Sequence, residues 1–431
     1  MTTNGSTFLE RILIKKLKSK SDSLFKAVNS LLTHPDAHLH DRRLVVNYVK
    51  TLLSEDHPDS AAYVLRLTSV THLVWERLNT GHWAQVWPGW RTLYGLLTLA
   101  RVEALARLTH GSALGDDSDL TRDLVKMCDL GLLLGGPDIL GGLLETLAQD
   151  MTEHLATLCD LHEGESESKK PRLSICDKSK LCNLNEASLK LTLPLQDIPV
   201  LACPDIAEFV TKAKLPARVT KLTGAMEDWP ALTSWSPQRL VRLAGPRTVP
   251  VEIGGRYTDS DWTQELMTVQ QFVDNYLCVE NGDRRVGYLA QHQLLSQVPA
   301  LKEDILTPDY CFTGDSDEEP DVNVWIGPGG TVSPAHTDKK HNVLCQVAGY
   351  KYVAVFYPDQ GRALYPDTTP MFENTSRVDL DSPDMEEFPL LSQLQGHHTI
   401  LGPGEMLYIP PLVWHYVRSL EQSFSVSFWW E

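Results

Sequence analysis

The hydrophobic pattern of the chain changes near residue 160. Before that point, apolar residues recur every three or four positions, as on the buried face of a helix. Residues 9–32 and 61–78 both show this spacing. It is clearest in one stripe, formed by Leu140, Leu143, Leu144, Leu147, Met151, Leu155 and Leu158. We therefore predict an all-α N-terminal domain over residues 1–162.

The second half of the chain has a different pattern, in which short runs rich in β-branched and aromatic residues are separated by turns. Such runs occupy residues 322–326, 342–347 and 351–357, and a glycine-rich turn at 327–330 follows the first of them. This alternation is typical of antiparallel strands. We predict a β-barrel domain over residues 196–431, which makes the chain an α+β protein.

A polar stretch separates the two predicted domains. Residues 163–172 are charged or small and show no apolar period, as is typical of a disordered connection. We therefore predict a polar linker over residues 163–195. The basic residues Lys169, Lys170 and Arg172 within it predict a nuclear location, with the cytoplasm as the alternative.

Three residues of the barrel region form a candidate metal site: His336, Asp338 and His415. Side chains at positions i and i+2 of a strand leave the same face, so His336 and Asp338 can enter one cavity. His415 follows after enough chain for several antiparallel strands and a return to that cavity. Three such ligands leave positions open on non-haem Fe(II), but a zinc hydrolase could also use three ligands and one water.

Other histidines in the sequence are weaker candidates. The His-Pro-Asp triplets at 34–36 and 57–59 resemble the metal motif, but their central proline lacks a ladder donor and indicates a turn. His397 and His398 are adjacent, so on a strand they would point to opposite faces. We interpret them as surface or loop histidines.

Residues 325–357, the segment 404–410 and the tail 424–430 together resemble a JmjC domain. The resemblance is strong over the predicted barrel and looser over the helical part. It implies a double-stranded β-helix, also called a cupin or JmjC barrel. It further implies Fe(II) held by His336, Asp338 and His415, with 2-oxoglutarate and O2 as co-substrates.

The same resemblance assigns a co-substrate pocket in this sequence. Lys351 would pair with the distal carboxylate of 2-oxoglutarate, since a buried ammonium needs an anion. Hydrogen bonds and contacts to the co-substrate are expected from Tyr288, Gln291, Ser333, Asn342 and Trp429. The alternative for Lys351 is a solvated lysine, because neither face of residues 351–357 is plainly polar.

Glu252 and Trp325 are the candidate substrate-binding residues. A carboxylate at a barrel mouth can bind a guanidinium through two hydrogen bonds, and an indole can stack on the same cation. The alternative for Glu252 is an exposed strand residue. The resemblance implies hydroxylation of a basic side chain in proteins, arginine first. It also leaves open histone lysine demethylation, methylarginine-directed peptidase activity and a noncatalytic JmjC-like scaffold.

Composition narrows the range of partners. The 431 residues carry a net charge of −17, which opposes direct nucleic-acid binding and favours basic proteins or peptides such as histones or ribosomal proteins. The eight cysteines form no Cys-x-x-Cys pair, so neither a zinc module nor a disulfide framework is expected. No stretch predicts a membrane span. We expect the helical domain either to bind a protein partner or to cover part of the barrel.

Overall fold

The computed structural model of the chain describes residues 16, 21–33, 40–53, 60–81, 85–108, 118–136, 139–163, 193–258, 261–278, 286–314, 316, 318–370 and 372–431. The two His-Pro-Asp triplets, most of the predicted linker and the basic cluster at 169–172 lie outside these residues. The chain divides into two compact units. One spans Met1–Ser168 with Pro246–Thr248, and the other spans Lys169–Gly245 with Val249–Glu431.

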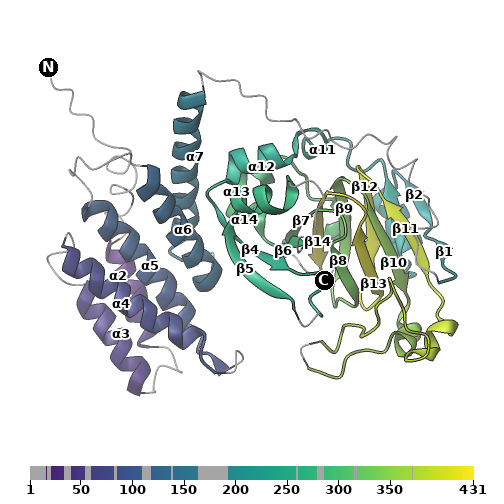
Figure 1. Ribbon diagram of the computed structural model, residues 1–431, viewed down its shortest axis with the longest axis horizontal. Helices are drawn as coiled ribbons and strands as arrows, with labels where there is room; N and C mark the ends of the chain where they lie inside the picture. Colours follow the sequence, from purple (N-terminus) through teal and green to yellow (C-terminus); the bar gives the residue numbers. More distant parts are fainter. Residues whose placement is uncertain are drawn as a thin grey trace. The chain divides into compact units, whose positions relative to one another are not determined.

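The first unit is helical, as the apolar period predicts (Figure 1). Its helices within the described ranges are α2 (Ser21–Leu31), α3 (His40–Leu53), α4 (Ala61–Leu78), α5 (Gly89–Leu108), α6 (Ser118–Gly135) and α7 (Leu143–Glu163). α5 packs against α4 and α6, and α6 packs against α7. None of the helices in this part of the chain is long and apolar enough to cross a bilayer.

Local sequence explains where two of these helices begin. The hydroxyl of Ser60 accepts a hydrogen bond from the Tyr63 N–H and caps α4. α7 begins at Leu143, so the predicted helix stripe started too early. Leu140 instead lies in a turn with a positive φ of 50°, followed by Gly141 and Gly142, which also have positive φ. The stripe from Leu143 to Leu155 faces the core.

The second unit contains two facing β-sheets, which confirms the predicted cupin-like α+β fold. In the described residues the smaller sheet has the order β1-β11-β10-β13-β8, and the larger has the order β2-β3-β12-β9-β14-β7-β6-β4-β5. The smaller sheet consists of β1 (Gln196–Asp197), β8 (Val332–His336), β10 (Lys351–Phe356), β11 (His397–Leu401) and β13 (Trp414–Ser419). The larger consists of β2 (Val200–Ala202), β3 (Thr220–Thr223), β4 (Thr248–Ile253), β5 (Thr263–Thr268), β6 (Gly287–His292), β7 (Asp321–Gly327), β9 (His341–Ala348), β12 (Glu405–Ile409) and β14 (Ser423–Trp430).

Both faces of β10, in the middle of the smaller sheet, are buried. On β10, Val353 and Val355 pack between the sheets with Leu344 of β9 and Leu407 of β12. The outer face of β10 packs beneath residues of the connection between β10 and β11, such as Leu364. That connection contains η7 (Pro358–Leu364) and η8 (Pro389–Gln393). Because alternation puts Lys351 on the Val353 face, its side chain enters the space between the sheets.

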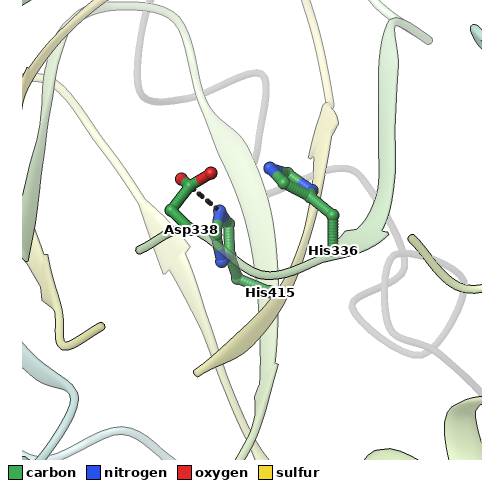
Figure 2. Close-up of side chains that lie close together, drawn as sticks. All are labelled: His336, Asp338 and His415. Atoms are coloured by element: carbon green, nitrogen blue, oxygen red, sulfur yellow. Dashed lines mark ion pairs between the residues drawn. The ribbon is translucent and has the colours of Figure 1, made fainter. Parts of the chain in front are cut away.

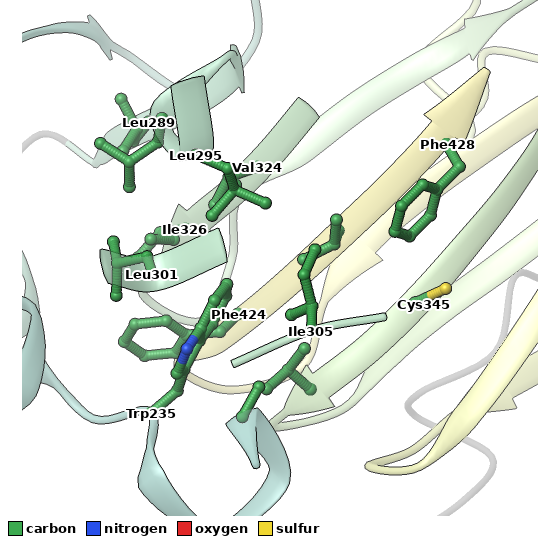
Figure 3. Packing of buried hydrophobic residues seen from close by; sticks show 14 of the residues in the cluster. Trp235, Leu289, Leu295, Leu301, Ile305, Val324, Ile326, Cys345, Phe424 and Phe428 are labelled. Atoms are coloured by element: carbon green, nitrogen blue, oxygen red, sulfur yellow. The ribbon is translucent and has the colours of Figure 1, made fainter. Parts of the chain in front are cut away.

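The outer face of the larger sheet is covered by short helices. Figure 3 shows part of this core, where Trp235 lies near Phe424 of β14, with ring centroids 6.5 Å apart. The helical segments of this unit are α10 (Ile206–Phe209), η4 (Val210–Lys214), α11 (Ala231–Ser234), α12 (Pro237–Ala244), α13 (Val269–Phe272), η5 (Val273–Leu277), α14 (Leu294–Gln297), α15 (Pro299–Lys302) and η6 (Asp309–Thr313).

The interpretation of His397 and His398 as surface or loop residues was wrong for His398, whereas His397 is half-buried. Both lie on β11, and His398 is buried on the outer face of the smaller sheet. Its ring centroid lies 5.7 Å from that of Tyr352, and its Nε2 lies 3.5 Å from Asp197. No local pattern indicates the Asp197 contact, because β1 pairs with β11 across a long chain separation.

Candidate metal centre

Two histidines face each other across neighbouring strands of the smaller sheet. His336 ends β8 and pairs in register with His415 near the start of β13, and their ring centroids are 4.2 Å apart (Figure 2). The Nδ1–H of His336 donates to the Pro334 carbonyl at 2.8 Å, and that of His415 to the Val413 carbonyl at 3.1 Å. In a neutral imidazole such a bond places the proton on Nδ1 and leaves Nε2 available as a metal ligand.

Asp338 completes the group, although not through strand geometry. β8 ends at His336, so the i, i+2 argument for Asp338 was wrong. The bend beyond the strand is held because the Leu412 N–H donates to the Asp338 carbonyl at 2.7 Å. Asp338 Oδ2 lies 3.5 Å from His415 Nε2, and one candidate ligand atom from each of the three residues lies within 4.8 Å of the others.

The electrostatics of this group favour metal binding. Burial, with a smaller contribution from the neighbouring His336, lowers the pKa of His415 to about 4 against the opposing effects of Asp338 and the Val413 hydrogen bond. His415 is therefore neutral at physiological pH. A neutral imidazole is the form that coordinates a metal ion.

A pocket with about 370 Å³ of empty space, part of it open to solvent, lies beside these residues between the two sheets. It is lined by Tyr288, Trp325, Ser333, His336, Asp338, Asn342, Leu344, Lys351, Ile409, His415, Val417, Ser427 and Trp429. Lys351 is 1 % exposed, and its Nζ donates to the Tyr288 hydroxyl at 3.2 Å. Burial lowers the pKa of Lys351 to about 7. An anion bound in the cavity would restore the charged form.

Close packing holds Tyr288 beside Lys351. A Cβ at Gly327 would lie 2.8 Å from the Tyr288 ring, so glycine at this position of β7 lets the ring approach the backbone. Burial raises the pKa of Tyr288, and the Glu252 charge raises it further, while a hydrogen bond with Ser333 acts in the opposite direction. The phenol therefore stays protonated and can donate a hydrogen bond.

The structure brings most of the predicted co-substrate residues to this cavity, but not all of the predicted set. Tyr288, Ser333, Asn342, Lys351 and Trp429 line it. Gln291 does not. Its side chain is exposed, because the pairing of β6 with β7 is irregular between Leu289 and His292, and Gln291 adopts a φ of 47° there.

The two predicted substrate residues are placed differently. Trp325 lines the cavity, and its indole N–H donates to the Ser427 hydroxyl at 2.8 Å. Glu252 lies outside the cavity lining but pairs in register with Tyr288 across β4 and β6. It is half-buried, and its carboxylate accepts from the Trp262 indole N–H at 3.4 Å. Burial raises the pKa of Glu252, against the Trp262 hydrogen bond.

Sequence reasoning missed three residues around this site. Ser427 alternates with Ser425 on β14 and carries no motif of its own. Tyr257 and Trp262 follow β4 in a polar loop, where aromatic residues give no periodic signal. The spacing of Trp262 from Glu252 across the turn after β4 was the one available clue.

Comparison with known proteins agrees with this geometry. Residues 209–431 match the model of the cupin-like domain family. The chain is 38 % identical over 392 residues to lysine-specific demethylase 8 of Xenopus tropicalis, covering 83 % of this chain and 86 % of that protein. It is 36 % identical over 368 residues to Jumonji C domain-containing protein 5 of Drosophila melanogaster, covering 83 % of this chain and 84 % of that protein. The chain belongs to the JmjC family of cupin-like proteins.

The residues of this JmjC barrel fit a metal ion and an acidic co-substrate. Among the described residues that line the cavity, three buried polar atoms lack a hydrogen-bond partner, namely Asp338 Oδ2, Asn342 Oδ1 and the Trp429 indole nitrogen. Such orphaned groups are rare unless a ligand, an ion or water satisfies them. His336, Asp338 and His415 would hold Fe(II), while Lys351, Tyr288, Ser333 and Asn342 would hold 2-oxoglutarate.

Proposed function

We propose that this protein is an Fe(II)- and 2-oxoglutarate-dependent oxygenase that hydroxylates a basic side chain, first of all arginine, in protein substrates. The observation that carries the proposal is Lys351. Its amine is buried in the same cavity as the His336, Asp338 and His415 donor group, and it makes no ion pair with any described residue. A hydrolytic zinc site has no need for such a cation.

The protein contributes positioning and exclusion of water. His336, Asp338 and His415 would hold the metal from one side and leave its other side to the cavity. Lys351 and Tyr288 would fix the distal carboxylate of 2-oxoglutarate deep between the sheets. Fe(II) with 2-oxoglutarate supplies the oxidant that removes hydrogen from a carbon. The remaining task of the chain is to hold one C–H bond close to that centre.

Glu252 supports a cationic substrate. Its carboxylate is half-buried and burial raises its pKa, and an approaching cation would favour the charged form. In the described part of the chain, no lysine or arginine forms an ion pair with it. A guanidinium suits this carboxylate because it can donate two parallel hydrogen bonds.

Lysine demethylation is the second candidate function. It is favoured by the names of two relatives, lysine-specific demethylase 8 of Xenopus tropicalis and of Danio rerio. Arginine hydroxylation and lysine demethylation share the step that hydroxylates a carbon. A hydroxylated N-methyl carbon then leaves as formaldehyde, whereas a hydroxylated side-chain methylene is a stable product. Peptidase activity and a noncatalytic scaffold rank behind these two functions, because neither needs a buried lysine beside the metal ligands.

The test uses the purified full chain with Fe(II), 2-oxoglutarate and a capped peptide that contains one central arginine. We expect succinate and a peptide that has gained one oxygen. A matched peptide with methyllysine in place of arginine tests demethylation through loss of the methyl group, and a cleaved arginine peptide would indicate a peptidase. Turnover that persists without 2-oxoglutarate would contradict the proposal.

The net charge of the chain supports a class of protein substrate. We propose basic proteins such as histones or ribosomal proteins as substrates, because the chain carries a net charge of −17. We propose a nuclear location with the cytoplasm as the alternative. The helical unit is proposed as a partner-binding module, and the exposed side chains of Tyr48, Leu65 and Trp75 support this role, being 50 %, 67 % and 47 % exposed.

A further inference from the structure

We propose that Tyr257 positions the target side chain between Glu252 and the metal ligands, and that Arg256 positions Tyr257. The proposal rests on the oxygenase function and names the residues that determine how its cationic substrate is presented. Both residues lie in the turn that follows β4, within the JmjC unit.

Tyr257 contacts Phe372 and Thr375, in the segment that lies beside the end of β8. Its hydroxyl lies 3.2 Å from the Thr375 hydroxyl, and its ring stacks on Phe372 at 6.2 Å with an interplanar angle of 23°. Thr375 faces His336 in an isolated antiparallel bridge. The Ser376 N–H donates to the Ala335 carbonyl at 2.7 Å. The phenol is thus tied to the backbone that carries a metal ligand.

Two carboxylates act on this phenol. Burial raises the pKa of Tyr257 to about 12, the Thr375 hydrogen bond opposes the rise, and the charges of Glu252 and Asp338 add to it. Tyr257 and Glu252 both lie outside the cavity lining, and the charges of Glu252 and Asp338 both act on the phenol. In the proposed arrangement, a cation held by Glu252 extends its carbon chain toward the metal along this ring. A neutral phenol offers that cation an oxygen acceptor and an aromatic face.

Arg256 holds the turn after β4 through ion pairs with two carboxylates. Its guanidinium pairs with Asp379 at 2.5 Å and with Asp381 at 3.5 Å. Asp381 also accepts the Tyr416 hydroxyl at 2.6 Å and pairs with Arg418, both on β13. Tyr416 directly follows the metal ligand His415. This cluster therefore connects the Tyr257 turn to β13, the strand that carries His415.

A purely structural role is the competing explanation. The side chains of Arg256 and Asp381 are each 21 % exposed, and that of Asp379 is 39 % exposed. Partly exposed ion pairs contribute little to stability. A network that also contacts the residue after a metal ligand is better explained by positioning. The experiment must therefore separate substrate presentation from folding.

The first experiment compares wild type, Tyr257→Ala and Tyr257→Phe in the full chain with Fe(II), 2-oxoglutarate and the central-arginine peptide. For Tyr257→Ala we expect the peptide KM to rise about tenfold, the scale of one desolvated cation–π contact. The ratio of succinate to hydroxylated peptide should rise as well. Tyr257→Phe keeps the ring and the fold but loses the Thr375 bond, so its effect should be smaller. The dissociation constant of 2-oxoglutarate should stay unchanged in both.

The second experiment tests whether Arg256 acts through Tyr257. We expect Arg256→Gln to raise the peptide KM about threefold, and Arg256→Lys, which keeps a charge for Asp379, to restore most of the loss. Added to Tyr257→Ala, Arg256→Gln should have no further effect, since coupled residues are non-additive. Lys212→Gln removes an exposed ion pair with Glu208 in the same unit and serves as the control.

The outcomes separate this inference from the proposed function. A wild type that consumes no 2-oxoglutarate with any basic peptide would refute the function itself. A wild type that hydroxylates the peptide while Tyr257→Ala and Tyr257→Phe keep its KM and coupling would refute the inference alone. Additive losses in the double variant would overturn the positioning role of Arg256. A citrulline peptide, which lacks the charge, should lose the difference between wild type and Tyr257→Ala.

Discussion

Two buried cations in this molecule have opposite surroundings. Arg247, in the segment Pro246–Thr248 of the helical unit, is 0 % exposed and bonds the equally buried Asp129 at 2.8 and 3.0 Å. Lys351, in the JmjC barrel, is 1 % exposed, and in the described part of the chain it contacts the Tyr288 hydroxyl without forming an ion pair. One charge has its anion built into the fold, and the other does not.

The difference separates a structural ion pair from a binding site. Breaking a buried pair is costly because it leaves one charge alone in a medium of low dielectric. Asp129 also accepts the Thr248 N–H at 2.6 Å, so that pair is part of the local backbone structure. Lys351 lies at a cavity with orphaned polar atoms, where the missing anion can enter from solution. An acidic co-substrate bound there would supply the anion that the described part of the fold does not give Lys351.

The largest expected effect comes from Lys351→Met. Without the ammonium, the 2-oxoglutarate dianion would be buried with no counter-charge, so its affinity should fall on the order of 10³-fold. The free energy of unfolding of the ligand-free protein should not fall, because the variant removes a buried amine that has no anion. Calorimetry with Mn(II) in place of Fe(II) and denaturant titration measure the two quantities.

The control for this variant is Lys302→Met, the same exchange at an exposed position of α15. It should change neither affinity nor stability. Normal 2-oxoglutarate binding by Lys351→Met would mean that this lysine is structural, and the contrast with Arg247 would disappear.

Arg247→Met is expected to act on stability instead. It removes the guanidinium that bonds the buried Asp129 carboxylate, so the free energy of unfolding should fall by roughly 3–5 kcal/mol. Combining it with Asp129→Asn should recover much of the loss, because the amide still accepts the Thr248 N–H without a charge. Urea titration followed by the helical circular dichroism signal measures both variants. A loss no larger than that of Lys302→Met would contradict the comparison.

The sequence predicts the barrel well because its strands carry local signals. The predicted runs at 322–326, 342–347 and 351–357 correspond to β7, β9 and β10 within one residue or two at each end. Alternation could not orient β10, because both of its faces are buried, one between the sheets and one under the β10–β11 connection. The position of Lys351 between the sheets therefore could not be predicted from the sequence pattern.

The site shows where sequence reasoning stops. His336 and Asp338 come together, but through a bend held by Leu412 rather than through strand alternation. Gln291 points away because of an irregularity in strand pairing, which leaves no mark in a single sequence. Tyr257 meets Thr375 across a long chain separation. Long-range pairs of this kind are invisible to periodicity.

A smaller effect is expected from pH. Burial lowers the pKa of Lys351 to about 7 in the ligand-free protein, from 10.5 for a free lysine. Above pH 7 the ligand-free site holds a neutral amine, so binding the dianion must take up a proton, and affinity should fall by up to about tenfold per pH unit. Calorimetry in buffers of different ionisation enthalpy should detect this uptake at alkaline pH and little of it at acidic pH.

The same shift affects stability with a defined sign. Between pH 7 and 10.5 the unfolded chain binds more protons at Lys351 than the folded chain does, so this residue makes the free energy of unfolding rise with pH. Below pH 7 its destabilising effect is complete. Lys351→Met should remove this component, whereas Lys302→Met should keep it. Identical pH profiles for Lys351→Met and wild type would show that the amine does not titrate in this window.

The smallest effect is expected from Ser333→Thr. Ser333 lies on the buried side of β8 opposite Val417, and its hydroxyl hydrogen-bonds the Tyr288 phenol. Threonine keeps the hydroxyl, so the KM for 2-oxoglutarate should change less than about threefold, whereas Ser333→Ala loses one hydrogen bond and should raise it about fivefold. Both changes should stay far below that of Lys351→Met in the same succinate assay. If Ser333→Ala matched Lys351→Met, hydrogen bonds rather than the buried charge would hold the dianion, and the contrast between the two cations would lose its chemical basis.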